Sequence, residues 1–304
     1  MRGPDSLGTQ RLTTSGPLRA EINTIPHWRQ PHRIGHGGNS YSTNMSLEHV
    51  RQLLPPAFLN EVQSLWFQHI LNKEDMVVPC QRSMMKWFRK DEEFDKICSH
   101  TFRPSLDAIK QQNITAQDII DSTHPSSPLE WISLIVLFDQ IPRNIYRGTE
   151  SIVVFTFFDP IAQQLAKAAI ASGVHQHPSV KYRIGHRLWI TMPFMHSESP
   201  EEHERAVRLI QEMTEDINEV DANDTPTSND SVNDVDELWE CKRIIAANKE
   251  AAIKLCESQI QFELKHRDII DKFGRYPHRN GPLGRAMMKD EQDFLYSGGD
   301  TFGG

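Results

Sequence analysis

The chain has 304 residues, of which 38% are hydrophobic and 24% charged, with a formal net charge of −8. This length allows one large domain, and the four widely spaced cysteines form no CxxC pair, which disfavours a zinc ribbon or an extracellular disulfide scaffold. No apolar run reaches the roughly 20 residues of a membrane-spanning helix, so we expect a cytoplasmic protein with no membrane partner.

Residues 1–48 are expected to form a disordered N-terminal tail. This segment is rich in Gly, Pro, Ser, Thr and Arg and shows no apolar periodicity. Its excess of arginine over acid is also a property of mitochondrial presequences, but its prolines oppose the amphipathic helix that such a leader needs. We therefore expect a plain tail, followed by a single all-helical domain over residues 49–304.

The first half of this domain shows strong helical periodicity. Residues 55–71 place apolar side chains at three- and four-residue spacings, and residues 91–102 continue this pattern until Pro104 is expected to interrupt it. Residues 127–141 are apolar almost all round, which indicates a buried central helix that ends near Pro142.

Two further helices carry terminal signals. Residues 159–173 begin with Asp159, a residue suited to capping, and end with Gly173, which suits the position after a last turn. Ser199 is followed three residues later by Glu202, which is the spacing of a capping box at the start of the next helix.

An acidic segment precedes the last long helix. Residues 215–240 hold ten Asp and Glu and no Lys or Arg, so we expect a disordered, solvated loop near residues 215–235. A helix is predicted from about residue 235 to 273, with a kink or break because of its length. Strand patterns are nearly absent, so the predicted fold class is all-α, a multi-helix bundle.

The first polar cluster is FDQIPRNIYRGT, at residues 138–149. It follows the most apolar predicted helix, so its charges lie at the edge of the core and must be paired. Asp139 and Arg143 are four residues apart, a spacing that suits a structural salt bridge at the helix end. The cluster fits such a bridge and a functional site equally well.

The second polar cluster is WITMPFMHSESPEEHE, at residues 189–204. His196 and Glu198 stand just before a helix start, where backbone N–H groups favour anions. Together with His203 they supply three groups that are able to bind a metal. Their spacing is not that of a known metal motif, so no metal site is expected.

The third polar cluster is KHRDIIDKFGRYPHRNGPLGR, at residues 265–285. After residue 272 it contains Arg275, His278, Arg279 and Arg285 and no acid. Guanidinium groups and free backbone N–H groups in a turn-rich loop suit a carboxylate or phosphate. The alternative is that these arginines bind the end of the preceding helix or its acidic residues. We favour an anion-binding loop.

These three segments, with WFRKDEEFDKI at residues 87–97, resemble the signature segments of the DUF924 family, bacterial and fungal proteins of uncharacterised function. The resemblance covers about residues 66–302. It implies an all-helical fold like a short tetratricopeptide-type stack. The chain departs from the family pattern at His203, where Gln is usual, and near Cys98, where Arg is usual.

The resemblance marks a candidate site but supplies no reaction. Catalytic roles are predicted for Asp139, His196, Glu198, His266 and His278. Substrate-binding roles are predicted for Arg143, Asn144, Arg147, Arg275, Arg279 and Asn280.

The phosphate-binding loop, the dinucleotide fingerprint, the nucleophile elbow and the HExxH motif are all missing from the sequence. We therefore expect a cofactor-independent enzyme of specialised metabolism, acting on a small and mostly apolar substrate with a carboxylate or carbonyl. Cyclisation or isomerisation, such as an intramolecular [4+2] cycloaddition, suits a helical pocket of imidazoles and arginines.

Two alternatives remain open at this point. One is a hydrolase for a phosphate or amide substrate, with or without a metal at His196, Glu198 and His203. The other is a non-enzymatic helical adaptor. With no basic excess outside the acidic segment, nucleic acid is not an expected partner, and the sequence does not indicate an oligomeric state.

Overall fold

The structure, a computed structural model, describes residues 40–221 and 232–302. Every regular element within these two ranges is a helix, which confirms the predicted all-α fold, and no helix there is long and apolar enough to cross a membrane. The α-helices are α1 Ser40–Leu53, α2 Pro56–Phe67, α3 Lys73–Val77, α4 Gln81–Phe88, α5 Glu92–Gln111, α6 Ala116–Thr123, α7 Pro128–Asp139, α8 Ile141–Ile145, α9 Asp159–Ala171, α10 Pro178–Lys181, α11 Ile184–Met195, α12 Pro200–Asn218, α13 Val232–Ala247, α14 Lys249–Phe273 and α15 Lys289–Tyr296. The other helical segments are η1 Gly148–Ser151, η2 Val154–Phe158, η3 Val174–Gln176 and η4 Pro277–Arg279.

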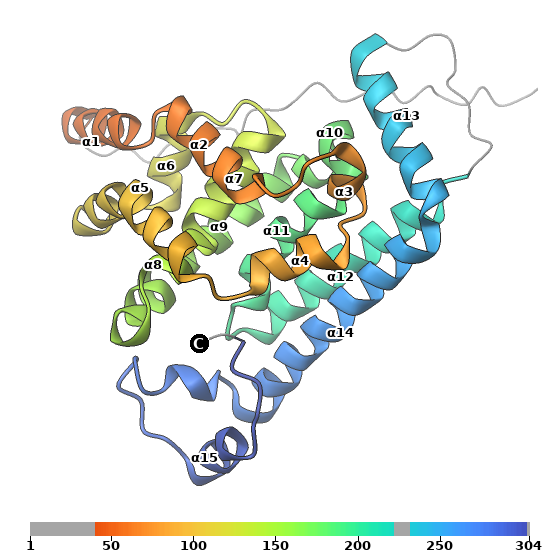
Figure 1. Cartoon of the computed structure of the whole chain (residues 1–304). Helices are drawn as coiled ribbons and strands as arrows, with labels where there is room; N and C mark the ends of the chain where they lie inside the picture. The colour runs from red at the N-terminus through yellow and green to blue at the C-terminus, as the bar shows by residue number, and fades with distance from the viewer. Residues whose placement is uncertain (1–39, 222–231, 303–304) are drawn as a thin grey trace, which may run out of the picture.

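The centre of the molecule is formed by α7, α9 and α11, which pack against one another (Figure 1). Ser127 caps α7 through a reciprocal pair of hydrogen bonds with Glu130, the arrangement of a capping box. From Trp131 to Asp139 every side chain of α7 is buried, and so is every residue of α11. The prediction of a buried central helix is therefore confirmed.

The N-terminal boundary differs from the prediction. Helix α1 begins at Ser40, and its Val50, together with Leu54 just after it, is buried. Helix α1 packs against α6, and its first residue lies nine residues before the predicted start of the domain at residue 49. Residues 1–39, the rest of the predicted tail, lie outside the described residues.

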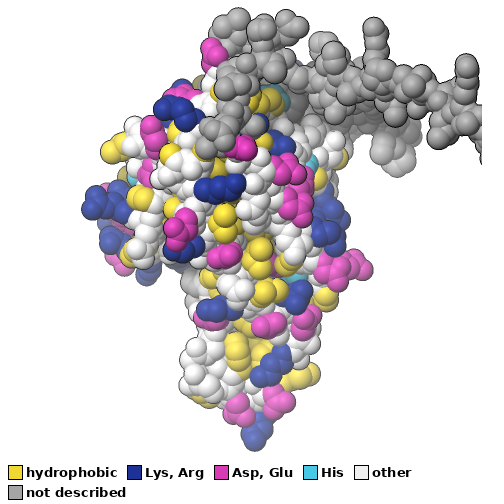
Figure 2. Space-filling view, turned by 90° about the vertical axis from the view of Figure 1, so that its right-hand side faces the viewer, with side chains coloured by type: hydrophobic (Ala, Val, Ile, Leu, Met, Phe, Trp, Pro, Cys, Tyr) yellow, Lys and Arg dark blue, Asp and Glu magenta, His cyan; other side chains and the backbone are white. Residues whose placement is uncertain are grey.

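Helices α12 and α14 pack side by side along one edge of the molecule (Figure 1). The predicted break before α14 is confirmed, because α13 ends at Ala247 and α14 begins at Lys249. Figure 2 faces this edge and shows basic and acidic side chains intermixed over it.

The acidic segment is shorter than predicted. Helix α12 continues to Asn218 and α13 begins at Val232, so helices occupy both ends of the expected loop. Asp216 is not solvated but buried, and it pairs with Arg187 and Lys181. A buried carboxylate of this kind requires such partners. Residues 222–231 lie outside the described part of the chain.

Pro104 does not interrupt its helix, which is contrary to the prediction. Helix α5 continues through it to Gln111. Pro104 is exposed, so water can satisfy the carbonyl that loses its N–H partner. On the opposite face Phe102, Leu106 and Ile109 are all buried, and their packing outweighs the roughly 3 kcal/mol that an interior proline costs.

Two predicted caps are also wrong. Asp159 is the first residue of α9 but does not cap it, because the π-helical segment η2 leads directly into that helix. Ser199 makes no side-chain cap hydrogen bond. Glu202 binds Lys167 of α9 instead, over 2.7 Å. Asp159 and Glu202 thus each form an ion pair with a residue of another helix, although the local spacing predicts that they cap their own helices.

The chain turns after α14 into a segment that we call the C-terminal lobe, residues 274–302, which lies below the main body in Figure 1. Gly274 permits this turn, since it takes a left-handed conformation with φ of 68°. The lobe has a small apolar core with the end of α14, formed by Ile269, Ile270, Phe273, Tyr276, Phe294 and Phe302.

Candidate functional site

The three polar clusters meet at one end of the core. The C-terminal ends of α7 and α11 bring Asp139 and His196 together, and the N-terminal end of α9 adds Asp159. The C-terminal lobe contributes Arg279, whose guanidinium lies 3.5 Å from the Asp159 carboxylate. Because α11 is buried along its whole length and α7 is buried from Trp131 to Asp139, their polar ends are fixed in position. We call these residues, with Arg143, the Asp139–His196 site.

Asp139 and His196 form its central pair. The Nδ1 atom of His196 lies 2.8 Å from Oδ1 of Asp139, and Gln140 donates to the other carboxylate oxygen. An ionised carboxylate only accepts, so Nδ1 carries the proton. In a neutral imidazole the Nε2 atom is then a free acceptor, and it makes no hydrogen bond within the described residues. The side chain of His196 is 13% exposed, whereas that of Asp139 is 1% exposed.

The charges of this pair follow from its surroundings. Burial on its own would raise the pKa of Asp139, but His196, Arg143 and the hydrogen bonds lower that pKa to about 2. Burial and then the charge of Arg143 lower the pKa of His196. Arg143 keeps its charge at every pH, whereas His196 is neutral above its lowered pKa. At neutral pH the arginine therefore stabilises the Asp139 carboxylate, and the imidazole is uncharged.

Asp159 is the residue that sequence reasoning missed. It accepts a hydrogen bond from Arg143 and lies against Arg279, so it links two of the predicted binding arginines. Because Asp159 stands at the start of a helix, the sequence predicts that it caps that helix. No local pattern indicates its contacts with Arg143 and Arg279. The Nε atoms of Arg143 and Arg279 and the Oδ2 atom of Asp159 are buried without a hydrogen-bond partner. Such atoms are rare in native structures because each one costs free energy.

Aromatic rings hold the Arg279 guanidinium in place. Its central carbon lies 4.5 Å from the ring centres of both Phe155 and Tyr276, within the range of a cation–π contact. The π-helical segment η2 supplies Phe155, and the lobe supplies Tyr276. The hydroxyl of Tyr276 donates to the carbonyl of Met195, over 2.6 Å. Stacking and this hydrogen bond together fix the lobe against the end of α11.

Two more of the predicted catalytic histidines lie near this site. Burial, with the charges of Arg279 and Arg143, lowers the pKa of His278 to about 4, and its Nδ1 atom is buried without a partner. Burial also lowers the pKa of His266 to about 3. His266 stacks on Phe302 at 3.5 Å between ring centres. Both imidazoles are therefore neutral at pH 7.

Glu198, predicted to be catalytic, anchors the lobe instead. Its carboxylate accepts two hydrogen bonds from the guanidinium of Arg285, at 2.9 and 2.8 Å, and one from the backbone N–H of Tyr276. Burial opposes ionisation, but these hydrogen bonds outweigh it and lower the pKa of Glu198. The carboxylate is thus ionised and already paired.

Four of the predicted binding residues have structural partners of their own. Asn144 donates to the backbone carbonyl of Gln140, and Arg147 makes two hydrogen bonds with Asp95 of α5, at 2.7 and 2.8 Å. Arg275 and Asn280 bind the same carboxylate, that of Glu291 in α15. Of these four, only Asn144 also lines a surface groove, described below.

His203, Glu198 and His196 do not come together as metal ligands. His203 is fully buried, and its two ring nitrogens face Glu263 and the carbonyl of Ser197. His196 binds Asp139, and Glu198 binds Arg285. No group of three His, Cys, Asp or Glu side chains in residues 40–221 and 232–302 is arranged to hold a metal ion.

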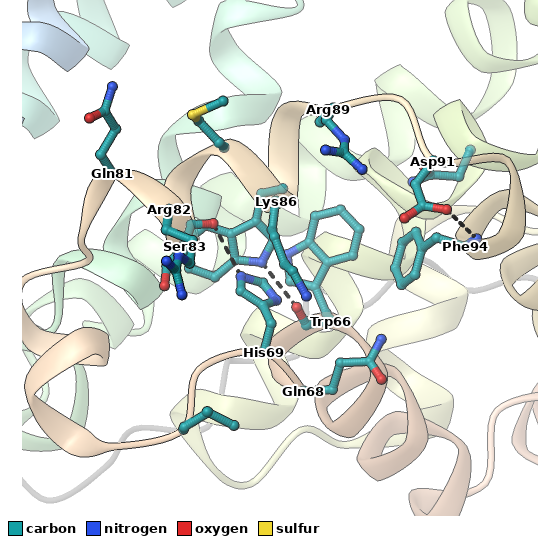
Figure 3. Close-up of a pocket in the computed structure, with 14 residues that line it drawn as sticks. Trp66, Gln68, His69, Gln81, Arg82, Ser83, Lys86, Arg89, Asp91 and Phe94 are labelled. Atoms are coloured by element: carbon teal, nitrogen blue, oxygen red, sulfur yellow. Dashed lines mark hydrogen bonds between the residues drawn. The ribbon is translucent and has the colours of Figure 1, made fainter.

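A groove of about 940 Å³ lies between α2 and α4 (Figure 3), and Asn144 is among the residues that line it. Trp66, Trp87 and Phe94 line it, together with Arg82, Lys86 and Arg89. Trp87 and Phe94 belong to the segment at residues 87–97 that resembled a family signature. The prediction did not include them in the site, because their apolar pattern also fits an ordinary helix face.

The sequence model of a family described as "Bacterial protein of unknown function (DUF924)" matches residues 62–299. No curated protein matches the chain. A solved structure of a protein of unknown function from Agrobacterium tumefaciens is similar, with a TM-score of 0.50 and 23% sequence identity, over 79% of this chain and 98% of that one. At this identity the similarity shows the fold alone.

Proposed function

The chain belongs to the DUF924 family, and from its geometry we propose an enzyme that transfers a proton on a small substrate, with His196 as the general base. The substrate carries a carboxylate or carbonyl, and the step is an isomerisation that needs no cofactor. The observation that carries this proposal is the buried Asp139–His196 pair, with Nε2 of the imidazole free and its side chain partly exposed.

His196 has the properties that a general base needs. Its lowered pKa keeps the ring neutral at pH 7, so Nε2 can accept a proton without first losing one. Asp139 fixes the tautomer and stabilises the imidazolium that forms. The proton leaves a carbon next to the carbonyl, and the electrons of that C–H bond move to the carbonyl oxygen. The substrate has a C=C bond next to that carbon, so the enolate extends over it. His196 then returns the proton to the far carbon of this C=C bond as the carbonyl re-forms.

The arginines supply the electrostatic part of this proposal. Negative charge develops on the substrate oxygen as the proton leaves, and guanidinium groups beside the base stabilise that charge. Arg143 and Arg279 both contact the carboxylate of Asp159, and each keeps a buried Nε–H without a partner. Unsatisfied donors of this kind favour a functional site over a set of purely structural ion pairs.

Among the expected reactions, isomerisation by proton transfer fits this arrangement best. A [4+2] cycloaddition moves no proton, so it makes no use of an oriented histidine. A metal-assisted hydrolase needs ligands that converge, whereas His196, Glu198 and His203 each bind a different residue. A structural adaptor needs no free imidazole nitrogen. A role in specialised metabolism remains part of the proposal.

Hydrogen–deuterium exchange into metabolites tests this function across many small molecules at once. Purified protein is incubated in D₂O with a mixture of small carboxylic acids and ketones, and mass spectrometry detects molecules that gain deuterium at carbon. We expect enrichment that depends on the protein, and a fall of at least about 100-fold in its rate in His196→Gln, since a general base contributes about 10²–10⁴-fold.

His100→Gln is the matched control, because His100 is an exposed histidine of α5. This variant is expected to exchange at the wild-type rate. Exchange that is unchanged in His196→Gln would contradict the assignment of the base. An isomeric product that His196→Gln still forms at the wild-type rate would contradict proton transfer by this base and favour the cycloaddition instead.

A further inference from the structure

The groove between α2 and α4 has a rigid aromatic floor. Trp66 is only 2% exposed, and its backbone carbonyl accepts a hydrogen bond from the indole of Trp87, over 3.0 Å. The two indoles each meet Trp189 of α11 edge-on, at 4.9 and 5.2 Å between ring centres. Phe94 lies beside Trp66, at 6.0 Å. These contacts fix the floor, so a ligand meets a surface that is already formed.

The rim of the groove carries three cations. Arg82, Lys86 and Arg89 are exposed and make no ion pair or side-chain hydrogen bond with any described residue. In Figure 3, Lys86 of α4 and Arg89, which follows that helix, extend toward the aromatic floor, whereas Gln81 points away. Asp91 is the one acid among the lining residues, and one of its carboxylate oxygens caps α5. The rim therefore has an excess of positive charge.

His69 lines the side of the groove and adds a neutral hydrogen-bond acceptor. Its Nε2 atom lies 3.2 Å from the carbonyl of Ser83, so Nε2 carries the proton and Nδ1 is left as an acceptor. Burial lowers the pKa of His69, which keeps the ring uncharged at neutral pH. The imidazole also meets Trp87 edge-on, at 4.8 Å. Its contacts with Ser83 and Trp87 thus hold His69 in place, and it does not add to the positive charge of the rim.

We propose that this groove binds an organic anion with a flat aromatic body. The ring lies on Trp87 and Phe94, which pack against the buried Trp66, while Lys86 and Arg89 hold its carboxylate. The volume of about 940 Å³ is within the range of small-molecule sites, and a hydrophobic floor with a few charged groups at the rim is their usual composition. This binding does not depend on the proposed proton transfer.

The probe is 2-naphthoate, compared with the neutral alcohol 2-naphthalenemethanol, which has the same ring system. Titration is followed by NMR on the indole N–H signal of Trp87, identified by its loss in Trp87→Phe. We expect saturable shifts of this signal with 2-naphthoate, and a dissociation constant about tenfold higher for the alcohol, since charge-assisted hydrogen bonds supply this difference.

Lys86→Gln/Arg89→Gln is expected to weaken 2-naphthoate about tenfold and leave the alcohol unchanged. Lys90→Gln is the matched control, because Lys90 follows Arg89 but faces Glu92, at 3.8 Å, and does not line the groove. Equal affinity for acid and alcohol would overturn the proposal. So would an unshifted indole signal, or equal losses in the double variant and in Lys90→Gln.

Discussion

Asp139 shows how a single buried charge can organise a site. Its carboxylate accepts hydrogen bonds from Gln140 and His196 and forms an ion pair with Arg143, at 3.4 Å. Taking a carboxylate out of water is costly unless such partners are present. The same contacts that offset this cost also orient the imidazole. Stability and the proposed chemistry therefore depend on one residue.

Asp139→Asn is expected to lower the free energy of unfolding by about 2–4 kcal/mol, because it leaves Arg143 with a single carboxylate partner. The amide also donates to Nδ1 of His196, which moves the imidazole proton to Nε2 and removes the free acceptor. Urea denaturation measures the first effect. Glu92→Gln, an exposed partner of Lys90, serves as the control and should change stability by less than about 1 kcal/mol.

At the scale of elements, the C-terminal lobe is assembled around one carboxylate. Glu291 in α15 is 1% exposed and accepts hydrogen bonds from Arg275, Asn280 and the backbone N–H of Met288. The hydrogen bond from Arg275 is the main reason that the pKa of Glu291 falls to about 2. Arg275 and Asn280, which the sequence predicts to bind substrate, thus hold in place the segment that carries Arg279.

Glu291→Gln is expected to loosen the lobe without unfolding the core. It weakens the paired hydrogen bonds from Arg275, at 2.6 and 2.9 Å. Amide hydrogen exchange in residues 275–296 should become about tenfold faster, since a hydrogen bond to a charged group contributes more than a neutral one. Exchange in α7 and α11 should not change. Asp290→Asn, at the exposed neighbouring position, is the control, and an equal effect there would contradict this role of Glu291.

At the scale of the whole molecule, buried neutral histidines make stability depend on pH. Burial lowers the pKa of His186 and His266 to about 3, and that of His278 to about 4. In the unfolded chain these groups titrate near pH 6.5. Between these values the unfolded state binds more protons than the folded state, so stability decreases as the pH falls.

The free energy of unfolding is accordingly expected to fall as the pH decreases from about 6.5 to 4, by up to about 1.4 kcal/mol per pH unit for each such histidine. The raised pKa of Glu263 partly offsets this slope. Urea denaturation at pH 7, 6 and 5 measures it. His186→Gln should give a shallower slope and His100→Gln an unchanged one. A flat profile for the wild type would contradict the neutral state of these groups.

The sequence predicts the fold class and most of the helices because apolar periodicity records which faces are buried. It also predicts that Asp139, Arg143 and His196 need partners, since polar residues at the ends of very apolar helices must be paired, and the structure brings these three side chains together. Local spacing fails where a distant element supplies the partner. Asp159 and Glu202 fit caps but bind Arg143 and Lys167. The groove at α4 was missed because its tryptophans also fit a core helix.

Arg279 lies 140 residues after Asp139, and the lobe that carries it follows every helix of the core. A ribosome releases the chain from the N-terminus, and segments fold as they emerge. The carboxylates of Asp139 and Asp159 therefore emerge with Arg143 as their first cationic partner, and Arg279 follows only after the helices of the core. The order of translation itself thus makes completion of this charge cluster a later step than the emergence of the core helices.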